Sequence, residues 1–438
     1  MEAMIIVFLV GYLAIALEHV LKVNKAAIAL MMAVVVWTIY AFIAPGEIES
    51  QISGQLGEVS SIIVFLLGAM TIVELVDLHG GFALVSHFIK ARRKKYLLWL
   101  ISAITFIMSA ALDNMTSTII MIAIMSKLVE NRTDKMWFAS AIVIAANSGG
   151  VWSPIGDVTT IMLWVNGNVT SGSLIPHLFL PSVVSLAIPV ALITFKINGN
   201  ELTLPMADDL EVGERLYPNI TRVDKVLIVV LGVGGLVMVP VFRAVTGLPP
   251  FMGVVMALAA LWLFTEFIYG KRTDIEESQK LRIAKALKKI DAPTIFFFFG
   301  ILMAVGALTE AGLLAKAASF LDVKIHNTFI ITGLIGILSA VVDNVPLVAA
   351  AMGMYPLADP ALVEIGSYAA NFLKDGAFWE LLAYCAGTGG SLLIIGSVSG
   401  VVAMGAENIS FGWYAKHITF RVFIGYVCGI ALYIFLFS

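Results

Sequence analysis

Long apolar runs recur from one end of the chain to the other, separated by short polar or basic segments. Most runs are close to the roughly 20 residues that a helix needs to cross about 30 Å of hydrocarbon, so each predicts a membrane-spanning helix. The expected crossings are residues 4–17, 26–44, 60–76, 136–164, 176–196, 226–241, 252–269, 293–309, 377–404 and 417–437.

Two further apolar stretches do not fit a single crossing. Residues 97–128 have basic segments at both ends, so the chain must enter and leave the membrane on the same side. We expect a re-entrant hairpin there, and a second one over residues 328–354 that dips from the opposite side. The predicted fold class is an all-α polytopic membrane protein with about ten transmembrane helices, two re-entrant hairpins and broken helices.

Composition agrees with this pattern. Hydrophobic residues make up 60% of the 438 residues and charged residues 13%, with a mean hydropathy of +0.97. A water-soluble domain of this size does not tolerate that balance, so the chain must lie in a bilayer.

Charge sets the orientation. Basic residues cluster in loops on one side of the predicted path, which the positive-inside rule makes cytoplasmic. The acidic segment 47–58 is then a loop outside. Four of the 27 Lys and Arg also fall outside: Arg243, Lys316, Lys324 and Lys374. We expect a multi-pass protein of the bacterial inner (cell) membrane.

The two halves of the chain resemble each other. Residues 62–84 align with 294–315, which places Gly68 on Gly300, and SAALDNMT (109–116) aligns with SAVVDNVP (339–346). A third match joins SGGVWSPIGDVT (148–159) to TGGSLLIIGSVS (388–399). Residues 1–200 and 224–438 would each hold five crossings and one hairpin, with a cytoplasmic connector at 201–223.

An odd number of crossings forces the second copy to be inverted relative to the first. Inverted repeats are typical of carriers that work by alternating access. The other interpretation is that duplication merely built a larger helical bundle.

Four polar breaks interrupt the predicted helices at membrane depth: residues 113–118, 147–160, 343–346 and 387–400. Backbone groups freed there must be satisfied within the protein or in a water-filled cavity. Unwound carbonyls and side-chain oxygens are suitable hard ligands for sodium.

We predict a cation and proton site in these breaks, and its residues carry carboxylate, carboxamide or hydroxyl groups. They are Asp113, Asn114, Thr116, Asp157, Asp343 and Asn344, with Na⁺ expected at all of these except Thr116. Supporting loop residues are Asn147, Ser148, Ser153, Pro154, Gly156, Thr159, Thr388, Ser397 and Ser399. The alternative for each Asp is that its side chain only caps a half-helix.

The predicted negative charge of the site favours a cation as the transported ion. No Lys or Arg lies in any of the four breaks, so we expect no basic group to neutralise the three carboxylates. A buried carboxyl group also holds a proton more readily than one in water, so sodium and protons would displace each other. This predicts exchange of Na⁺ (or Li⁺) for H⁺; the alternative is a sodium-coupled anion (dicarboxylate-type) symporter of the same fold.

An enzyme is not expected, because the breaks hold no nucleophile–base pair, phosphate-binding loop or metal-ligand cluster. We therefore expect no cofactor. The expected partners are the sodium or lithium ion, the proton and membrane lipid, without nucleic acid.

At SAALDNMTSTI (109–119) and NSGGVWSPIGDVTTIMLW (147–164) the sequence is similar to the NhaD-type sodium/proton antiporters of the ion transporter superfamily. The resemblance covers essentially the whole chain. It implies a homodimer in which a transport domain moves against a scaffold in an elevator-like cycle. The implied scaffold helices are residues 1–45 and 224–270, and the implied transport parts are 60–196 and 293–438.

The hairpin tips depart from those of related dicarboxylate carriers, which have Ser-Asn-Thr. Here the tips have Asp113-Asn114 and Asp343-Asn344. Replacement of a neutral serine by aspartate at both tips fits a cation exchanger.

Overall fold

The chain is helical wherever long apolar runs predict helices. The computed structural model describes residues 1–16, 18–44, 46, 48–82, 93–197, 221–270, 280–364 and 366–437. The predicted connector 201–223 therefore lies outside the described residues except for its last three. The first half contains α1 (Glu2–Ala16), α2 (Glu18–Leu21), α3 (Lys25–Ile43), α4 (Ile48–Leu78), α6 (Lys94–Leu112), α7 (Asn114–Leu128), α8 (Arg132–Gly150), α9 (Val158–Val165) and α10 (Ser171–Thr194).

The second half begins with α12 (Arg222–Thr246), α13 (Pro250–Gly270), α14 (Ile283–Lys289), α15 (Ala292–Glu310) and α16 (Leu313–Lys324). It continues with α17 (Thr328–Leu338), α18 (Asn344–Met354), the short 3₁₀ helix η2 (Tyr368–Phe372), α19 (Ala377–Gly389), α20 (Val398–Glu407), α21 (Phe411–His417) and α22 (Thr419–Phe437).

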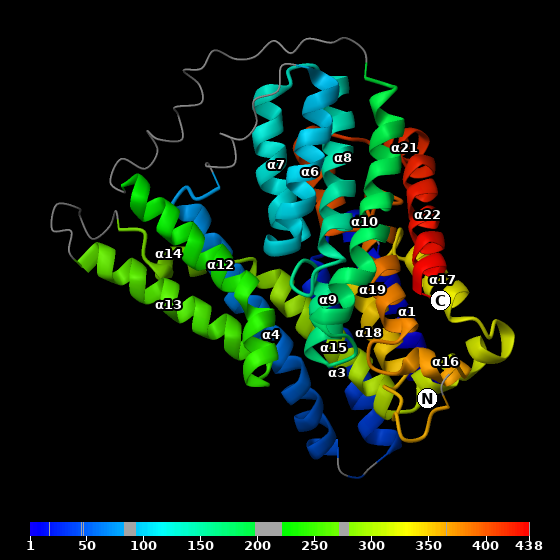
Figure 1. Cartoon of the computed structure of the whole chain (residues 1–438). Coiled ribbons are helices and arrows are strands. Elements are labelled where there is room, and N and C mark those ends of the chain that lie inside the picture. Colours follow the sequence, from blue (N-terminus) through cyan, green and yellow to red (C-terminus); the bar gives the residue numbers. More distant parts are fainter. Residues whose placement is uncertain are drawn as a thin grey trace.

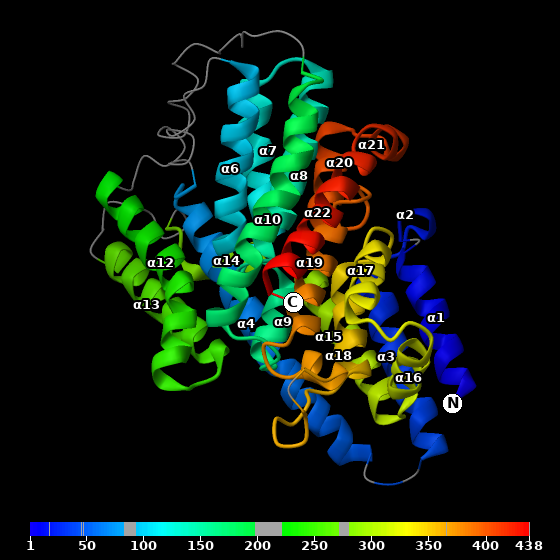
Figure 2. The same cartoon turned by 45° about the vertical axis from the view of Figure 1, so that its right-hand side comes forward.

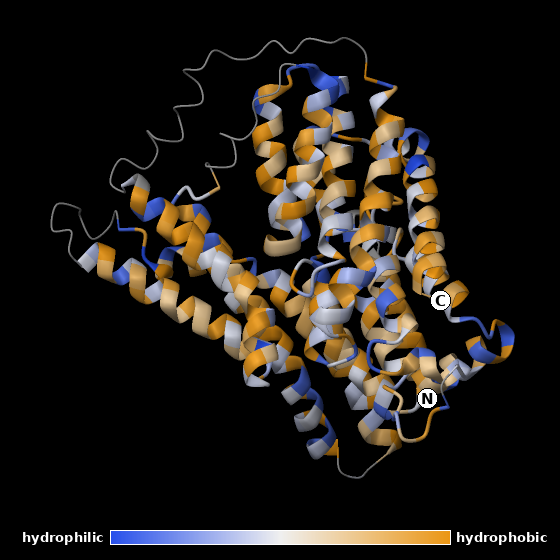
Figure 3. Cartoon of the chain, viewed as in Figure 1, coloured by the Kyte–Doolittle hydropathy of each residue, from blue (hydrophilic) through white to orange (hydrophobic). Residues whose placement is uncertain are grey.

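Eight of the helices in the described part of the chain are long and apolar enough to cross a membrane: α3, α4, α6, α10, α12, α13, α15 and α22. The prediction of an all-α, polytopic membrane protein is confirmed at this level. Figure 3 shows apolar residues along the length of α12 and α13, and polar ones gathered at the ends of helices. An apolar outer surface of this kind suits contact with lipid.

The acidic segment predicted as a loop over 47–58 differs from its prediction, because its described residues, 48–58, are helix. α4 begins at Ile48 and runs for 31 residues. The segment contains no proline, and Ile48, Ile52, Leu56 and Val59 recur at the spacing of one helix face. Ile52 and Val59 on that face pack against or within the apolar core, so the helix continues past the crossing.

Two of the close helix pairs that join the halves of the chain pack α3 along α15 and α13 along α4. A glycine lies at each contact. A side-chain carbon at Gly300 would come within 2.6 Å of the backbone of Ala29 in α3, and one at Gly68 within 2.7 Å of Val254 in α13. Gly68 and Gly300 are the two positions that the sequence alignment places together. With α1, α12 and α14, these helices form what we call the α3–α15 group.

A second set of helices packs around α8 and α19. The pairs α6 with α8, α17 with α19 and α10 with α22 are in close contact, and we call α6–α10, α17, α19, α20 and α22 the α8–α19 group. α18 contacts both α15 and α19, so it lies between the groups. In Figures 1 and 2, α12 and α13 lie at one side of the molecule, and α6, α7, α8 and α10 stand together in its upper part.

Replacement of Gly300 by Ala should destabilise the protein by about 1–3 kcal/mol, because the added methyl group must push α15 away from the backbone of α3. Thermal unfolding in detergent measures this loss. Gly54→Ala is the matched control, since a side-chain carbon at Gly54 in α4 meets nothing within 4 Å. A Gly300→Ala protein that melts no lower than the control would contradict the close α3–α15 contact.

Candidate functional site

Four interruptions in the helices create the candidate site. α6 gives way to α7 at Asp113, and α17 is separated from α18 by residues 339–343. α8 and α9 are separated by residues 151–157, and α19 and α20 by residues 390–397. The interruptions at 151–157 and 390–397 lie inside predicted breaks. The other two meet their predicted breaks only at Asp113 and Asp343, because residues 114–118 and 344–346 are helical.

Glycines let the broken helices approach their neighbours. A side-chain carbon at Gly149 in α8 would lie 2.2 Å from the Phe106 carbonyl oxygen in α6, and one at Gly389 in α19 would lie 2.0 Å from the Gly336 carbonyl oxygen in α17. Serines at matching positions reinforce both contacts. Ser109 donates to the Ala146 carbonyl at 2.6 Å, and Ser339 donates to the Ala386 carbonyl at 2.7 Å.

Asp157 is the centre of the site. Its side chain is buried, with 1% of its surface exposed. Asn114 donates from Nδ2 to Asp157 Oδ2 at 2.8 Å, and Asn344 donates from Nδ2 to both carboxylate oxygens at 3.3 and 3.4 Å. The carboxamides that follow the two breaks at Asp113 and Asp343 therefore meet on one carboxylate.

Asn147 links this carboxylate to the second half of the chain. Its Oδ1 accepts from Asn114 Nδ2 and from Ser399 Oγ, both at 3.2 Å. Its Nδ2 donates to Ser391 Oγ at 2.8 Å and to Ser397 Oγ at 2.9 Å. One fully buried side chain thus connects the α6–α7 break with the α19–α20 break.

All three aspartates cap helices, as the alternative interpretation predicted. In each, Oδ1 accepts a backbone amide hydrogen: from Thr116 to Asp113 at 2.8 Å, from Thr159 to Asp157 at 2.9 Å, and from Val345 to Asp343 at 3.3 Å. The second oxygen has a different partner in each case. Capping therefore uses one oxygen and leaves Oδ2 for other interactions.

Asp113 and Thr116 form a local pair. Thr116 donates from Oγ1 to Asp113 Oδ2 at 2.8 Å, in addition to its backbone contact. The backbone of Asp113 has φ 84° and ψ 160°, which lets α7 begin immediately after α6 ends. Asp113 does not reach Asp157 directly, and its neighbour Asn114 makes that contact.

The expectation of no basic group at the site is wrong. Lys25, the first residue of α3, places Nζ 2.9 Å from Asp343 Oδ2. The sequence argument counted only the basic residues inside the breaks, whereas Lys25 lies 318 positions away along the chain. It was assigned to a loop, but α3 brings its side chain to the α17–α18 break.

The remaining predicted residues divide into two sets. Thr159, Ser397 and Ser399 belong to the network around Asp157 and Asn147. Ser148 accepts from Ser185, Ser153 and Pro154 form the turn before Gly156, and Thr388 donates within its own helix. Gly156 has no room for a side chain beside the Gly150 carbonyl. Sequence analysis missed Ser391, although it lies inside a predicted break.

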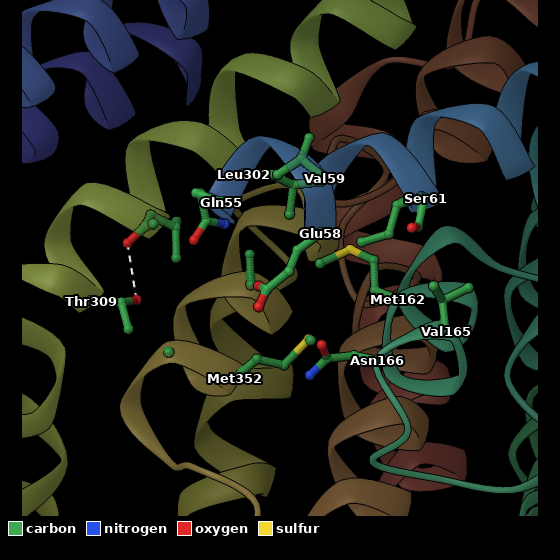
Figure 4. Close-up of a pocket in the computed structure, with 15 residues that line it drawn as sticks. Gln55, Glu58, Val59, Ser61, Met162, Val165, Asn166, Leu302, Thr309 and Met352 are labelled. Atoms are coloured by element: carbon green, nitrogen blue, oxygen red, sulfur yellow. Dashed lines mark hydrogen bonds between the residues drawn. The ribbon is translucent and has the colours of Figure 1, made fainter. Parts of the chain in front are cut away.

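Two cavities flank the site along α4. The first, which we call the outer cavity because it lies at the end of α4 that the predicted topology places outside, has a volume of about 310 Å³ and is lined by Glu58, Ile62, Met162 and Leu302, among others. Figure 4 shows the Glu58 carboxylate pointing into it, with Asn166 and Met352 opposite.

The inner cavity, of about 260 Å³, reaches Asp113, Asn114 and Thr116 and is also lined by Glu74 and Asp77. Ile62 of α4 lines the outer cavity and Phe65 the inner one, so about one helical turn separates them.

A membrane-crossing helical bundle with a buried acidic centre between two cavities defines a polytopic membrane protein of the transporter class. The model of the citrate transporter family (CitMHS) matches residues 12–370, and the chain belongs to this family.

Its relatives include sodium/proton antiporters 1 and 2 of Arabidopsis thaliana. The first is 45% identical over 437 residues, covering 99% of this chain and 72% of the relative; the second is 41% identical over 435 residues, covering 98% of both. The Na⁺/H⁺ antiporter NhaD of Vibrio cholerae is 28% identical over 465 residues, covering 99% of this chain and 91% of the relative. The resemblance to NhaD-type antiporters is confirmed, and these relatives are transporters, not enzymes.

Replacement of Asn147 by Ala should lower the free energy of unfolding by about 1–3 kcal/mol, because buried serine and carboxamide groups lose their partner. Thermal unfolding of the purified protein checks this. Asn371→Ala, which removes one half-buried hydrogen bond to the Tyr368 carbonyl, should cost less. Equal losses in the two variants would show that Asn147 does not hold the breaks together.

Proposed function

We propose that the protein exchanges Na⁺ (or Li⁺) for H⁺ across a membrane. The observation that carries this proposal is the convergence of Asn114 and Asn344 on the carboxylate of Asp157. Relatives of this chain along nearly its whole length are named sodium/proton antiporters, which supports the same function.

A single site centred on Asp157, which extends to Asp113 and Asp343 beside its Asn114 and Asn344 partners, would bind either ion. The buried carboxylate accepts hydrogen bonds from two neutral carboxamides and from Thr159, and none of the described residues places a cationic group in direct contact with it. A proton on the carboxylate or a sodium ion beside it would each neutralise that charge. Rotation of the Asn114 and Asn344 carboxamides would turn their oxygens toward the metal ion, and hard oxygen ligands suit sodium. Occupancy by one ion then excludes the other, which is the basis of exchange.

Asp113, Thr116 and Asp343 would complete the path. Asp113 and Thr116 line the inner cavity, which connects them to the cytoplasmic side of the predicted topology. Glu58 in the outer cavity would attract cations from the other side. Sodium ligands at Asp113, Asn114, Asp157, Asp343 and Asn344 remain our proposal, and no cofactor is required.

Alternating access of two inverted repeats would carry the site from one side to the other. Gly68 and Gly300 occupy equivalent positions in the two halves, and so do Gly149 and Gly389. In each pair both glycines lie at a close helix contact, which supports an internal repeat. The paired helices at each tip, α6–α7 and α17–α18, would be the two re-entrant hairpins.

In an elevator-like cycle the transport parts (60–196 and 293–438) would move against scaffold helices (1–45 and 224–270). α4 lies at the seam, because it contacts α9 as well as helices of the α3–α15 group, and α15 contacts α18 between the groups. We further propose a homodimer, embedded in lipid, in the bacterial inner membrane.

Sodium-coupled anion transport is the alternative. Lys25 is the basic group that such a site would need, but its charge is already matched by Asp343. Asp113 and Asp157 add two carboxylates at the same breaks, so the site has an excess of acidic groups. This excess favours a cation.

Asp157→Asn should abolish sodium-driven proton movement, because a carboxamide caps α9 nearly as well but carries no negative charge. The purified protein in liposomes, with a pH-sensitive dye inside, should respond to added Na⁺ or Li⁺, and the variant should behave like empty liposomes. Asp113→Asn and Asp343→Asn should show the same loss.

The matched control is Asp322→Asn, since Asp322 accepts from Tyr355 and Tyr368 away from the site. This variant should retain exchange. A wild-type protein that ignores sodium and lithium but accumulates a labelled dicarboxylate would replace exchange with anion transport.

A further inference from the structure

The ion pair between Lys25 and Asp343 joins two parts of the molecule. Lys25 lies at the start of α3, in the α3–α15 group, and Asp343 lies in the break between α17 and α18. In Figure 2, α2 lies level with the upper end of α17, close to where α3 begins. Two other ion pairs of the described residues stay within one group: Lys94 with Asp134 between α6 and α8, and Lys289 with Glu74 between α14 and α4.

The Lys25 ammonium group is enclosed by its neighbours and has little contact with solvent. Its Nζ lies 4.4 Å from the centre of the Phe297 ring in α15. The side chains of Lys25 and Asp343 are only 22% and 12% exposed. Separation of the pair without replacement partners would leave two poorly hydrated charges, which is costly. The pair therefore resists displacement of the α17–α18 break away from α3.

Lys25 also lies near acidic residues on its own side of the Lys25–Asp343 pair, away from the α17–α18 break. The Lys25 backbone amide donates to Glu18 Oε1 at 3.2 Å, and the charges of Glu18 and Asp291 both act on the lysine side chain. A Lys25 ammonium that leaves Asp343 would thus remain near carboxylates of the α3–α15 group. Asp343, in contrast, would need another cation.

We propose that Lys25 and the transported cation compete for the Asp343 carboxylate, so that the ion pair acts as a latch between α3 and the α17–α18 break. A cation at Asp343 takes the place of the Lys25 ammonium, and Lys25 turns to Glu18. The break is then free to move relative to α3 only when Asp343 has received its replacement charge. This inference rests on the proposed function, because it takes the cation from there.

The latch is tested first by sodium binding to the purified wild-type protein and to Lys25→Met, measured by calorimetry at constant ionic strength in choline chloride. Loss of the competing ammonium should lower the half-saturating sodium concentration at least about fivefold, within the usual range of coupling between sites. Lys25→Arg keeps the charge and should stay close to the wild type.

Lys94→Met is the matched control, because Lys94 and Asp134 form a pair of 2.8 Å with 19% and 12% exposure inside one group. This variant should bind sodium as the wild type does. Unchanged sodium binding in Lys25→Met, or an equal gain in Lys94→Met, would overturn the latch while leaving sodium binding and exchange intact.

Hydrogen–deuterium exchange gives a second readout that does not depend on a variant. Sodium should increase amide exchange over residues 18–30 in the wild type, because Lys25 leaves its partner, and should leave this segment unchanged in Lys25→Met. If Lys25→Met does not fold, the wild-type result decides alone: no sodium effect on residues 18–30 in a protein that binds sodium rejects the latch. A wild type that binds no sodium rejects both the latch and the proposed function.

Discussion

A helix that begins in the interior of a membrane protein must satisfy its first backbone amides without bulk water, and this constraint organises the centre of the molecule. α7, α9 and α18 all begin at interruptions of this kind, and each is capped by an aspartate. The cap fixes one carboxylate oxygen and thereby orients the other. Oδ2 of Asp113 faces Thr116, that of Asp157 faces Asn114, and that of Asp343 faces Lys25. The same side chains therefore cap the broken helices and carry the negative charge of the candidate site, although a carboxamide could replace each of them as a cap.

Local sequence patterns were enough to predict the broken helices, but they were not enough to predict the long-range contacts. The glycines, Pro154 and the Asp-Asn pairs mark the breaks directly, because they act on the backbone within a few residues. The contacts of Lys25 with Asp343 and of Asn147 with Ser391 join residues 318 and 244 positions apart, and no local pattern encodes such a distance. The acidic segment 47–58 was misassigned for a related reason: its charges suggested a loop, but burial of Ile52 and Val59 against the core outweighs them. Inversion of the two repeats and the domain division remain predictions.

The two cavities give α4 and α15 a particular importance. Ile62 and Leu302 line the outer cavity, and Phe65 and Phe298 line the inner one, so both helices pass from one cavity to the other. Phe65 packs edge-on against Trp164 of α9, with ring centres 6.2 Å apart. On α4 and α15 the side chains between the two cavities are therefore apolar. Ile62, Phe65, Phe298 and Leu302 offer no oxygen ligand to a cation, so in the proposed cycle an ion would pass them together with ligands from the site.

The backbone conformation of Asp113 limits how thermal stability can be increased by substitution at this position. A φ of 84° with ψ near 160° belongs to a region that glycine occupies freely and that other residues occupy at a cost of about 1–3 kcal/mol. Selection for thermal stability alone would therefore favour glycine at this position and would remove a carboxylate from the inner cavity. In the proposed exchange, backbone stability and ion binding are therefore opposed at Asp113, and the most stable variant at this position would not be the best carrier.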